Sequence, residues 1–266
     1  MSIKVLEDAL ATTRRFQAGR FEVARTTTLT TNDSVTLRYQ GEFDRSTTRL
    51  ATVQTFAGSK RLLDAIAAAS GSGANVDVAK SKIYTLRDDK VIYVGPSPDG
   101  TDPQTWLKYD QAALERVSPD TAVQLNELLV LVIDAVTFTK NATVEKLPRA
   151  DINGKTSDVY RATVDGVSVL AELGNSLIRN LKATQLVGQI TAPVPATAYI
   201  ENGRLIRLTL DLSPLHADLV KLSGNVTAEA ALKTTKSTTS EFTLLESSPP
   251  GSIKFTVPEP AKVRVA

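Results

Sequence analysis

The feature that most constrains this sequence is a pair of tight-turn signals on either side of one amphipathic segment. Asn153-Gly154 and Asn202-Gly203 each combine two residues that tolerate the positive φ of a two-residue hairpin. The first signal leads into a predicted strand at Asp158–Asp165, and the second joins the arms of a hairpin over Thr197–Leu212. Two antiparallel hairpins are thus fixed on either side of the segment that joins them.

That joining segment is predicted to be a helix from about Val167 to Val187. Its leucines recur at spacings of three and four, so they form one apolar stripe: Leu170, Leu173, Leu177 and Leu181. The strand that follows offers an apolar side, because alternate residues of a strand point to the same face. On it Ile206, Leu208, Leu210 and Leu212 share one face, and Leu205, Arg207, Thr209 and Asp211 share the other.

The N-terminal part of the chain predicts a helix and then a meander of antiparallel strands. Ser2 can cap the helix and Gly19 ends it. In the strand Ser34–Asp44, apolar residues alternate with polar ones, which is typical of a strand with one wet face. Further strands are predicted at Arg20–Thr30, Thr48–Ala57, Lys82–Leu86, Val91–Val94 and Thr105–Asp110, with a short helix at Lys60–Ala69. Trp106 is interpreted as a core or rim residue rather than a ligand platform.

A second long helix is predicted to start at Ser118-Pro119-Asp120. Its residues Leu128–Ile133 are apolar all round, which is unusual for a helix on one side of a sheet. Two interpretations stay open: the helix is sandwiched between a sheet and a neighbouring helix, or one side faces a cavity that a lipid chain fills. Further on, Ser223–Glu246 predicts a hairpin turning near Lys236-Ser237. The proline-rich tail 247–266 predicts an edge strand around Ile253–Val257 and an extended end.

Composition excludes several classes of function. The formal net charge is +2 over 266 residues, and no basic stripe suits a phosphate backbone, so nucleic acid is not an expected partner. With no cysteine and one histidine, the usual metal sites and catalytic triads cannot be assembled. His216 has Ser213 and Asp218 nearby, but residues so close in sequence seldom face one another as a triad. We therefore expect no enzyme, no metal site and, with no linker, a single domain over residues 1–266.

Several short motifs also occur in an order known from one protein family. Asp151-Ile-Asn-Gly-Lys-Thr and the segment Ala192–Leu208 are preceded by Ile83-Tyr-Thr-Leu, Val94-Gly-Pro, Thr105-Trp-Leu and Pro119-Asp120, and Thr256–Val263 closes the series. In this order the chain resembles the actinobacterial LppX/LprG (LppX_LprAFG) lipoproteins. The likeness covers most of Ile83–Leu212.

The resemblance implies an α+β, LolA-like fold. Such a fold is a curved antiparallel β half-barrel with helices packed across its concave face, enclosing an apolar cavity that holds acyl chains. It also implies no cofactor apart from the bound acyl lipid as cargo, and an extracytoplasmic lipoprotein of the cell envelope, anchored by a lipidated cysteine. Because this sequence has no cysteine, the signal peptide and lipobox cysteine are absent from it or this member is soluble. Segments 60–78 and 215–247 exceed the length expected for the family.

The expected function is non-enzymatic binding and transport of acylated lipids or lipoglycans across the cell envelope through a hydrophobic cavity. The expected partners are such a lipid, a membrane surface and a membrane transporter, and the chain is expected to be a monomer. The alternatives are an envelope-stress sensor or a structural envelope protein of the same fold that acts through protein contacts. The residues predicted to line the cavity are Leu37, Tyr39, Phe43, Leu128, Leu131, Val132, Leu170, Leu173, Leu177 and Leu181.

Overall fold

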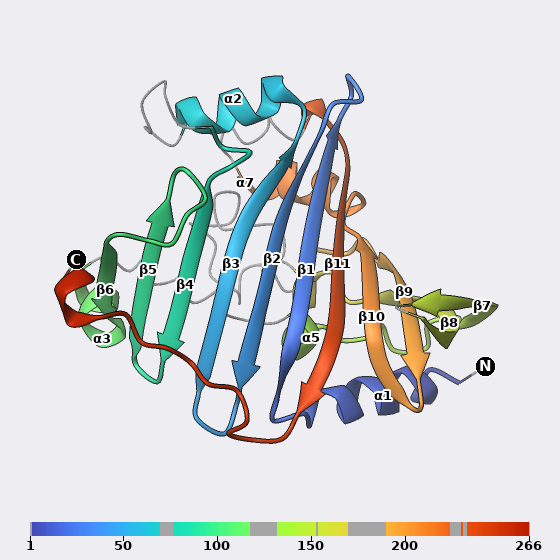
Figure 1. The fold of residues 1–266 in the computed structure, drawn as a ribbon. Coiled ribbons are helices and arrows are strands. Elements are labelled where there is room, and N and C mark those ends of the chain that lie inside the picture. Colours follow the sequence, from blue (N-terminus) through green and yellow to red (C-terminus); the bar gives the residue numbers. More distant parts are fainter. Residues whose placement is uncertain are drawn as a thin grey trace. The chain divides into compact units, whose positions relative to one another are not determined.

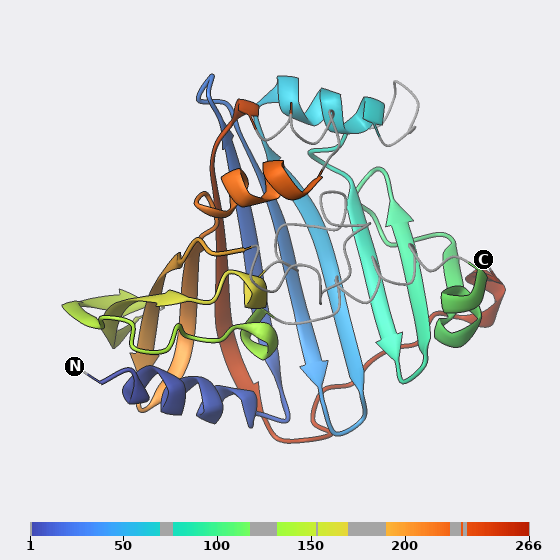
Figure 2. The ribbon, with the colours of Figure 1, turned by 180° about the vertical axis from the view of Figure 1, so that it is seen from behind.

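The computed structural model describes residues 2–69, 77–117, 132–152, 154–169, 190–223, 230 and 233–265 (Figures 1 and 2). The chain forms two compact units, and each is described by itself. Unit 1 comprises Met1–Phe16 and Asn126–Leu244, and unit 2 comprises Gln17–Leu125 and Leu245–Ala266. The sequence-based prediction of a single domain stays a prediction.

Unit 2 is built on an antiparallel meander. Its strands are β1 (Ala18–Leu29), β2 (Ser34–Asp44), β3 (Arg49–Gly58), β4 (Lys82–Asp88), β5 (Val91–Ser97) and β6 (Trp106–Asp110), each paired with the next. The short strand β12 (Val263–Val265) adds to β6 in parallel. Helix α2 (Lys60–Ala69) contacts β2 and β3, and α3 (Gln111–Val117) follows β6. Positive φ values at Asn32 and Asp89 provide the tight turns after β1 and β4.

The register gives the unit 2 sheet two chemically different faces, because paired residues of neighbouring strands lie on the same side. Leu37 pairs with Phe56, Tyr39 with Gln54 and Phe43 with Leu50. The side that we call the apolar face is mainly apolar, although Arg25, Gln54 and Arg87 also lie on it. Its apolar residues are Val23, Leu37, Tyr39, Phe43, Leu50, Phe56, Ile83, Ile92, Val94 and Leu107. The opposite side, the charged face, carries Arg20, Glu22, Arg38, Gln40, Glu42, Lys82 and Lys108, with Tyr84 and Trp106. The predicted alternation in Ser34–Asp44 is confirmed.

Unit 1 is a second antiparallel arrangement. Its strands lie in the order β11 (Thr235–Ser248), β10 (Arg204–Asp211), β9 (Val194–Glu201), β8 (Lys155–Val164) and β7 (Glu145–Ile152). Its helices include α1 (Lys4–Arg14), α5 (Val132–Ala135) and α7 (Leu215–Ser223). Figure 2 shows α1 against β10, where Leu6, Ala9, Leu10 and Thr13 of the helix are buried. The core of unit 1 includes Val164, Leu208, Leu210, Leu212 and Phe242, all at most 1% exposed.

The two hairpins predicted from the turn signals are confirmed. Gly154 has φ 78°, and Asn202 and Gly203 have φ 49° and 73°, which are the left-handed values that a two-residue hairpin turn needs. The alternation in β10 is confirmed from Arg207 onward. A bulge between Leu205 and Arg207 interrupts it, so both Leu205 and Ile206 are buried.

Two predictions near the C-terminus are wrong. The hairpin predicted in Ser223–Glu246 does not turn near Lys236-Ser237: helix α7 ends at Ser223, and the described residues Thr235–Ser248 are one strand with no positive φ at Lys236 or Ser237. A turn there needs such a φ, and the threonine-rich sequence favours a continuous strand. Residues 253–257 are not an edge strand either. The prolines at 258 and 260 remove backbone donors, and only Val263–Val265 beyond them joins the sheet.

The prediction of an α+β fold built on antiparallel strands is confirmed. Most of the helix predicted from about Val167 to Val187, and most of the one predicted to start at Ser118-Pro119-Asp120, lies outside the described residues, so the apolar cavity that they would enclose stays a prediction. Among the described residues, no helix has both the length and the apolar character to cross a membrane.

Candidate functional site

Strand β2 places three of the predicted lipid-lining residues on the apolar face of unit 2. Phe43 is 3% exposed, and the centroid of its ring lies 6.2 Å from that of the Phe21 ring. The guanidinium of Arg45 lies over the Phe43 ring, 5.4 Å from its centroid. Leu37 and Tyr39, nearer the start of the strand, are only half-buried. Phe43 therefore belongs to a closed part of this face, whereas Leu37 and Tyr39 belong to a part that is partly open.

The lining residues that were predicted on helices cannot be placed beside the three residues of β2. Leu128, Leu131, Leu170, Leu173, Leu177 and Leu181 lie outside the described residues. Val132 is the first residue of α5, and only its backbone is described. The lining set as a whole stays a prediction, of which the structure brings together the three residues of β2.

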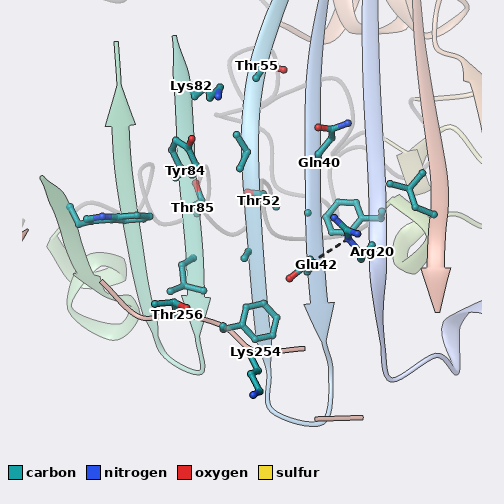
Figure 3. Close-up of a pocket in the computed structure, with 18 residues that line it drawn as sticks. Arg20, Gln40, Glu42, Thr52, Thr55, Lys82, Tyr84, Thr85, Lys254 and Thr256 are labelled. Carbon is teal, nitrogen blue, oxygen red and sulfur yellow. Dashed lines mark ion pairs between the residues drawn. The ribbon is translucent and has the colours of Figure 1, made fainter. Parts of the chain in front are cut away.

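The charged face of unit 2 holds a pocket that the sequence did not predict. It has a volume of about 590 Å³ and lies between strands β1 to β4, the start of β6 and residues 254–256 of the C-terminal segment (Figure 3). Aromatic and aliphatic side chains make up part of its wall: Val53, Tyr84, Leu86, Trp106 and Phe255. We call it the charged-face pocket.

Tyr84 and Trp106 form the aromatic wall of this pocket. Their ring centroids are 6.3 Å apart with an interplanar angle of 63°, an edge-to-face arrangement that the ring quadrupoles favour. Gly95 on the strand between them gives the indole its space. A Cβ atom there would lie 3.0 Å from the indole ring and 2.7 Å from the ring of Pro103. The glycine is therefore required by close packing and not by a turn.

The arginines around the pocket form ion pairs, whereas its lysines do not pair with any described residue. Arg20 and Glu42 form an ion pair across β1 and β2 at 3.3 Å, and Arg38 forms another with Glu22 at 3.4 Å. Exposed pairs of this kind contribute at most about 1 kcal/mol each to stability. Lys82 and Lys254 form no ion pair with any described residue. The pocket wall therefore carries three cationic side chains and one carboxylate.

The C-terminal segment that closes one side of the pocket is held at both ends, and we call residues 251–262 the strap. At its start the amide of Gly251 donates a 2.8 Å hydrogen bond to Oδ2 of Asp44, which is 1% exposed. Burial by itself would raise the pKa of Asp44, but hydrogen bonds from Ser46 and from Gly251 outweigh it and lower that pKa. At its end, Val263 of β12 pairs with Trp106. Figure 1 shows the strap running across strands of unit 2.

The sequence does not predict this pocket, because the tail that forms one of its walls was expected to be an edge strand. The sequence holds one signal for the pocket. Lys82, Tyr84 and Leu86 are alternate residues of β4 and share one face, so polar and apolar side chains follow one another on the side opposite Ile83. Trp106 was interpreted as a core or rim residue. It is half-buried at the wall of the pocket, which residues 254–256 of the strap also line, and it pairs with Val263 just after the strap.

The residues around His216 do not form a triad. The ring Nε2 lies 3.1 Å from Oγ1 of Thr238, while Oγ of Ser213 donates to Asp211, and Oδ2 of Asp218 accepts from the amides of Thr191 and Ala192. No hydrogen bond between described residues joins two members of the set. Burial lowers the pKa of His216, although the charge of Asp211 opposes this. The described residues also contain no group of acidic or histidine side chains placed to hold a metal ion.

No protein-family model and no curated protein matches this chain. Among solved structures, it is similar to the Mycobacterium tuberculosis lipoprotein LppX at 12% identity, over 93% of this chain and 95% of that one, with a TM-score of 0.43. It is similar to LprF from Mycobacterium bovis at 15% identity, over 97% and 95%, with a TM-score of 0.45. A LolA superfamily protein from Nitrosomonas europaea aligns at 13% identity over 78% and 76%, with a TM-score of 0.22. Each of these three TM-scores is below 0.5, so the fold of this chain rests on its own strands and helices.

Proposed function

We propose that this protein binds acylated lipids, without catalysis, on the apolar face of the unit 2 sheet, and carries them within the cell envelope. The observation that carries the proposal is this face itself. It runs across β1 to β6, and its part around Leu37, Tyr39 and Phe56 is half-buried rather than closed. The motif order that resembles the LppX/LprG lipoproteins supports the same function.

The hydrophobic effect is strong enough for such a task. Each buried methylene contributes about 0.8 kcal/mol, so one chain of ~16 carbons could contribute on the order of 12 kcal/mol before the costs of ordering are subtracted. A lipid with two chains would leave slowly. Its delivery would then need a membrane surface or a transporter that opens the site, and we propose these as partners of a monomeric carrier.

The test is mass spectrometry of the purified protein, native and after organic extraction, from a host that makes envelope lipids. A stoichiometric lipid with at least one long chain is the expected result. The variants Leu37→Arg and Tyr39→Asp should lose it, because a charge would lie against the acyl chain. The matched control is Gln40→Arg, which places a new charge on the opposite face of the same strand and should load normally.

Normal loading of both apolar-face variants would show that the lipid does not lie on this face. Protein that is free of lipid and does not take up a fluorescent fatty acid would contradict the carrier function. That result would favour the structural or sensor alternatives, in which the same face serves only as core.

A further inference from the structure

We propose that the charged-face pocket is a second ligand site, which takes a small amphipathic carboxylate with an apolar body of medium length. This site is independent of the lipid-binding face, because it lies on the opposite side of the unit 2 sheet. At about 590 Å³ the pocket falls within the range of roughly 300–1,000 Å³ typical of small-molecule sites.

Polar and apolar side chains are unevenly distributed inside the pocket. Lys82 and Thr55 are paired across β4 and β3, and Figure 3 shows them at one end, with Tyr84 next to them on the side toward the middle. Apolar side chains follow on the same face: Leu86, which is 4% exposed, comes after Tyr84 on β4, and the Trp106 ring lies edge to face with that of Tyr84. The Arg20–Glu42 ion pair lies at the level of Leu86, two strands away. A ligand with one polar end and an apolar body fits this sequence of surfaces.

The charges of the pocket wall favour an anionic ligand. Arg20 is neutralised by Glu42, while Lys82 forms no ion pair with a described residue, so one ammonium group in the pocket wall is free to bind an anion. Lys254 adds a second positive charge at the other end, where Figure 3 places it. A carboxylate near Lys82 can also accept a hydrogen bond from the hydroxyl of Thr55. Charge-assisted hydrogen bonds of this kind are roughly twice as strong as neutral ones.

The strap forms a wall of the pocket that can move without loss of sheet pairing. Residues 253–258 form no backbone–backbone hydrogen bond with a described residue, although the segment is fixed at Asp44 before them and at β6 after them. Phe255 of this segment is half-buried against the pocket. A wall that is fixed at both ends and unpaired in between can admit a ligand without breaking the sheet.

Trp106 makes the site directly observable, because it is the only tryptophan of the chain and lines the pocket. Decanoate, kept below its micelle concentration, should change the fluorescence of Trp106 in a saturable way. Decanol should bind at least tenfold more weakly, because it lacks the charge, and decyltrimethylammonium should give no saturable change.

The decisive variant is Lys82→Gln, which should weaken decanoate binding about tenfold and leave decanol binding unchanged. Its matched control is Lys90→Gln, in the exposed turn between β4 and β5, which should bind like the parent. An unchanged Trp106 emission maximum without ligand would show that the Lys82→Gln variant is folded.

Three results would overturn the proposal. The first is the absence of a saturable Trp106 signal with decanoate. The second is equal affinity for decanoate and decanol, or for the parent and Lys82→Gln. The third is loss of the signal in Leu37→Arg, which would place the ligand on the apolar face. If the Leu37→Arg variant keeps the signal, decanoate binds at a site separate from the proposed lipid-binding face. The pocket proposal and the lipid-carrier proposal can therefore be refuted independently.

Discussion

Thr13 shows how much can depend on one buried hydroxyl. Its Oγ1 lies 2.9 Å from the amide nitrogen of Leu205 and 3.1 Å from the carbonyl oxygen of the same residue, at the bulge of β10. Thr13 is 1% exposed, so no water can replace the hydroxyl. The pairing of β10 with β11 covers only Arg207–Asp211, so these backbone groups lie beyond it, and the hydroxyl of Thr13 satisfies them.

The substitution Thr13→Val should therefore lower the free energy of unfolding by about 1–3 kcal/mol, because it keeps the shape and leaves buried backbone groups unpaired. Urea denaturation measures this change. Thr12→Val, one residue earlier on the same helix, removes only an exposed bond to the Asp8 carbonyl and should cost less than about 0.5 kcal/mol. Equal losses in the two variants would mean that helix propensity, and not the contact with β10, explains the effect.

Asp44 gives a prediction that depends on pH. The substitution Asp44→Ala should cost about 1–3 kcal/mol at neutral pH, because the amides of Ser46 and Gly251 lose their acceptor. The lowered pKa of Asp44 means that its contribution is complete above the ordinary value of 3.8 and is lost as the pH falls through the folded-state pKa. The difference between parent and variant should hence shrink only below about pH 4. Asp64→Ala on the exposed side of α2 is the control.

At the scale of elements, alternation and turn residues predicted most of what was found. The alternation in β2 and the Asn202-Gly203 turn are properties of a few neighbouring residues, and the structure agrees with both. The errors concern β11 and the strap, where the partner of a segment lies far away in sequence. A threonine-rich segment and a proline-rich tail do not encode locally which strand they will meet. The site was predicted in part only, since β2 is local and the pocket needs the strap.

The Asn202-Gly203 turn provides the test at this scale. Gly203→Val should destabilise the protein by about 1–2 kcal/mol, because a β-branched residue is strained at φ 73°. No heavy atom lies within 4 Å of a Cβ placed there, so a steric clash cannot contribute. Asn202→Gly should change stability by less than about 1 kcal/mol, since glycine also accepts this conformation. Thermal unfolding of both variants measures the contrast, and a neutral Gly203→Val would contradict the turn assignment.

At the scale of the whole molecule, ligand removal should change stability by mass action. A lipid that binds only the folded protein adds about 2.7 kcal/mol at a free concentration of 100 times its Kd. Delipidated protein should therefore unfold at a lower temperature than the loaded form, and adding the extracted lipid should remove this difference. Calorimetry of both forms decides this. Identical unfolding temperatures would mean that the lipid does not bind the folded state selectively.

The strap also has a consequence for how the protein folds. Strands β1 to β6 pair in the order of the chain, so their contacts close short loops and can form early. The bond between Asp44 and Gly251 joins residues 207 positions apart, and it closes a much longer loop. The charged-face pocket thus gains its last wall after its sheet exists. In a refolding experiment, the fluorescence of Trp106 should reach its native value later than the circular dichroism of the strands.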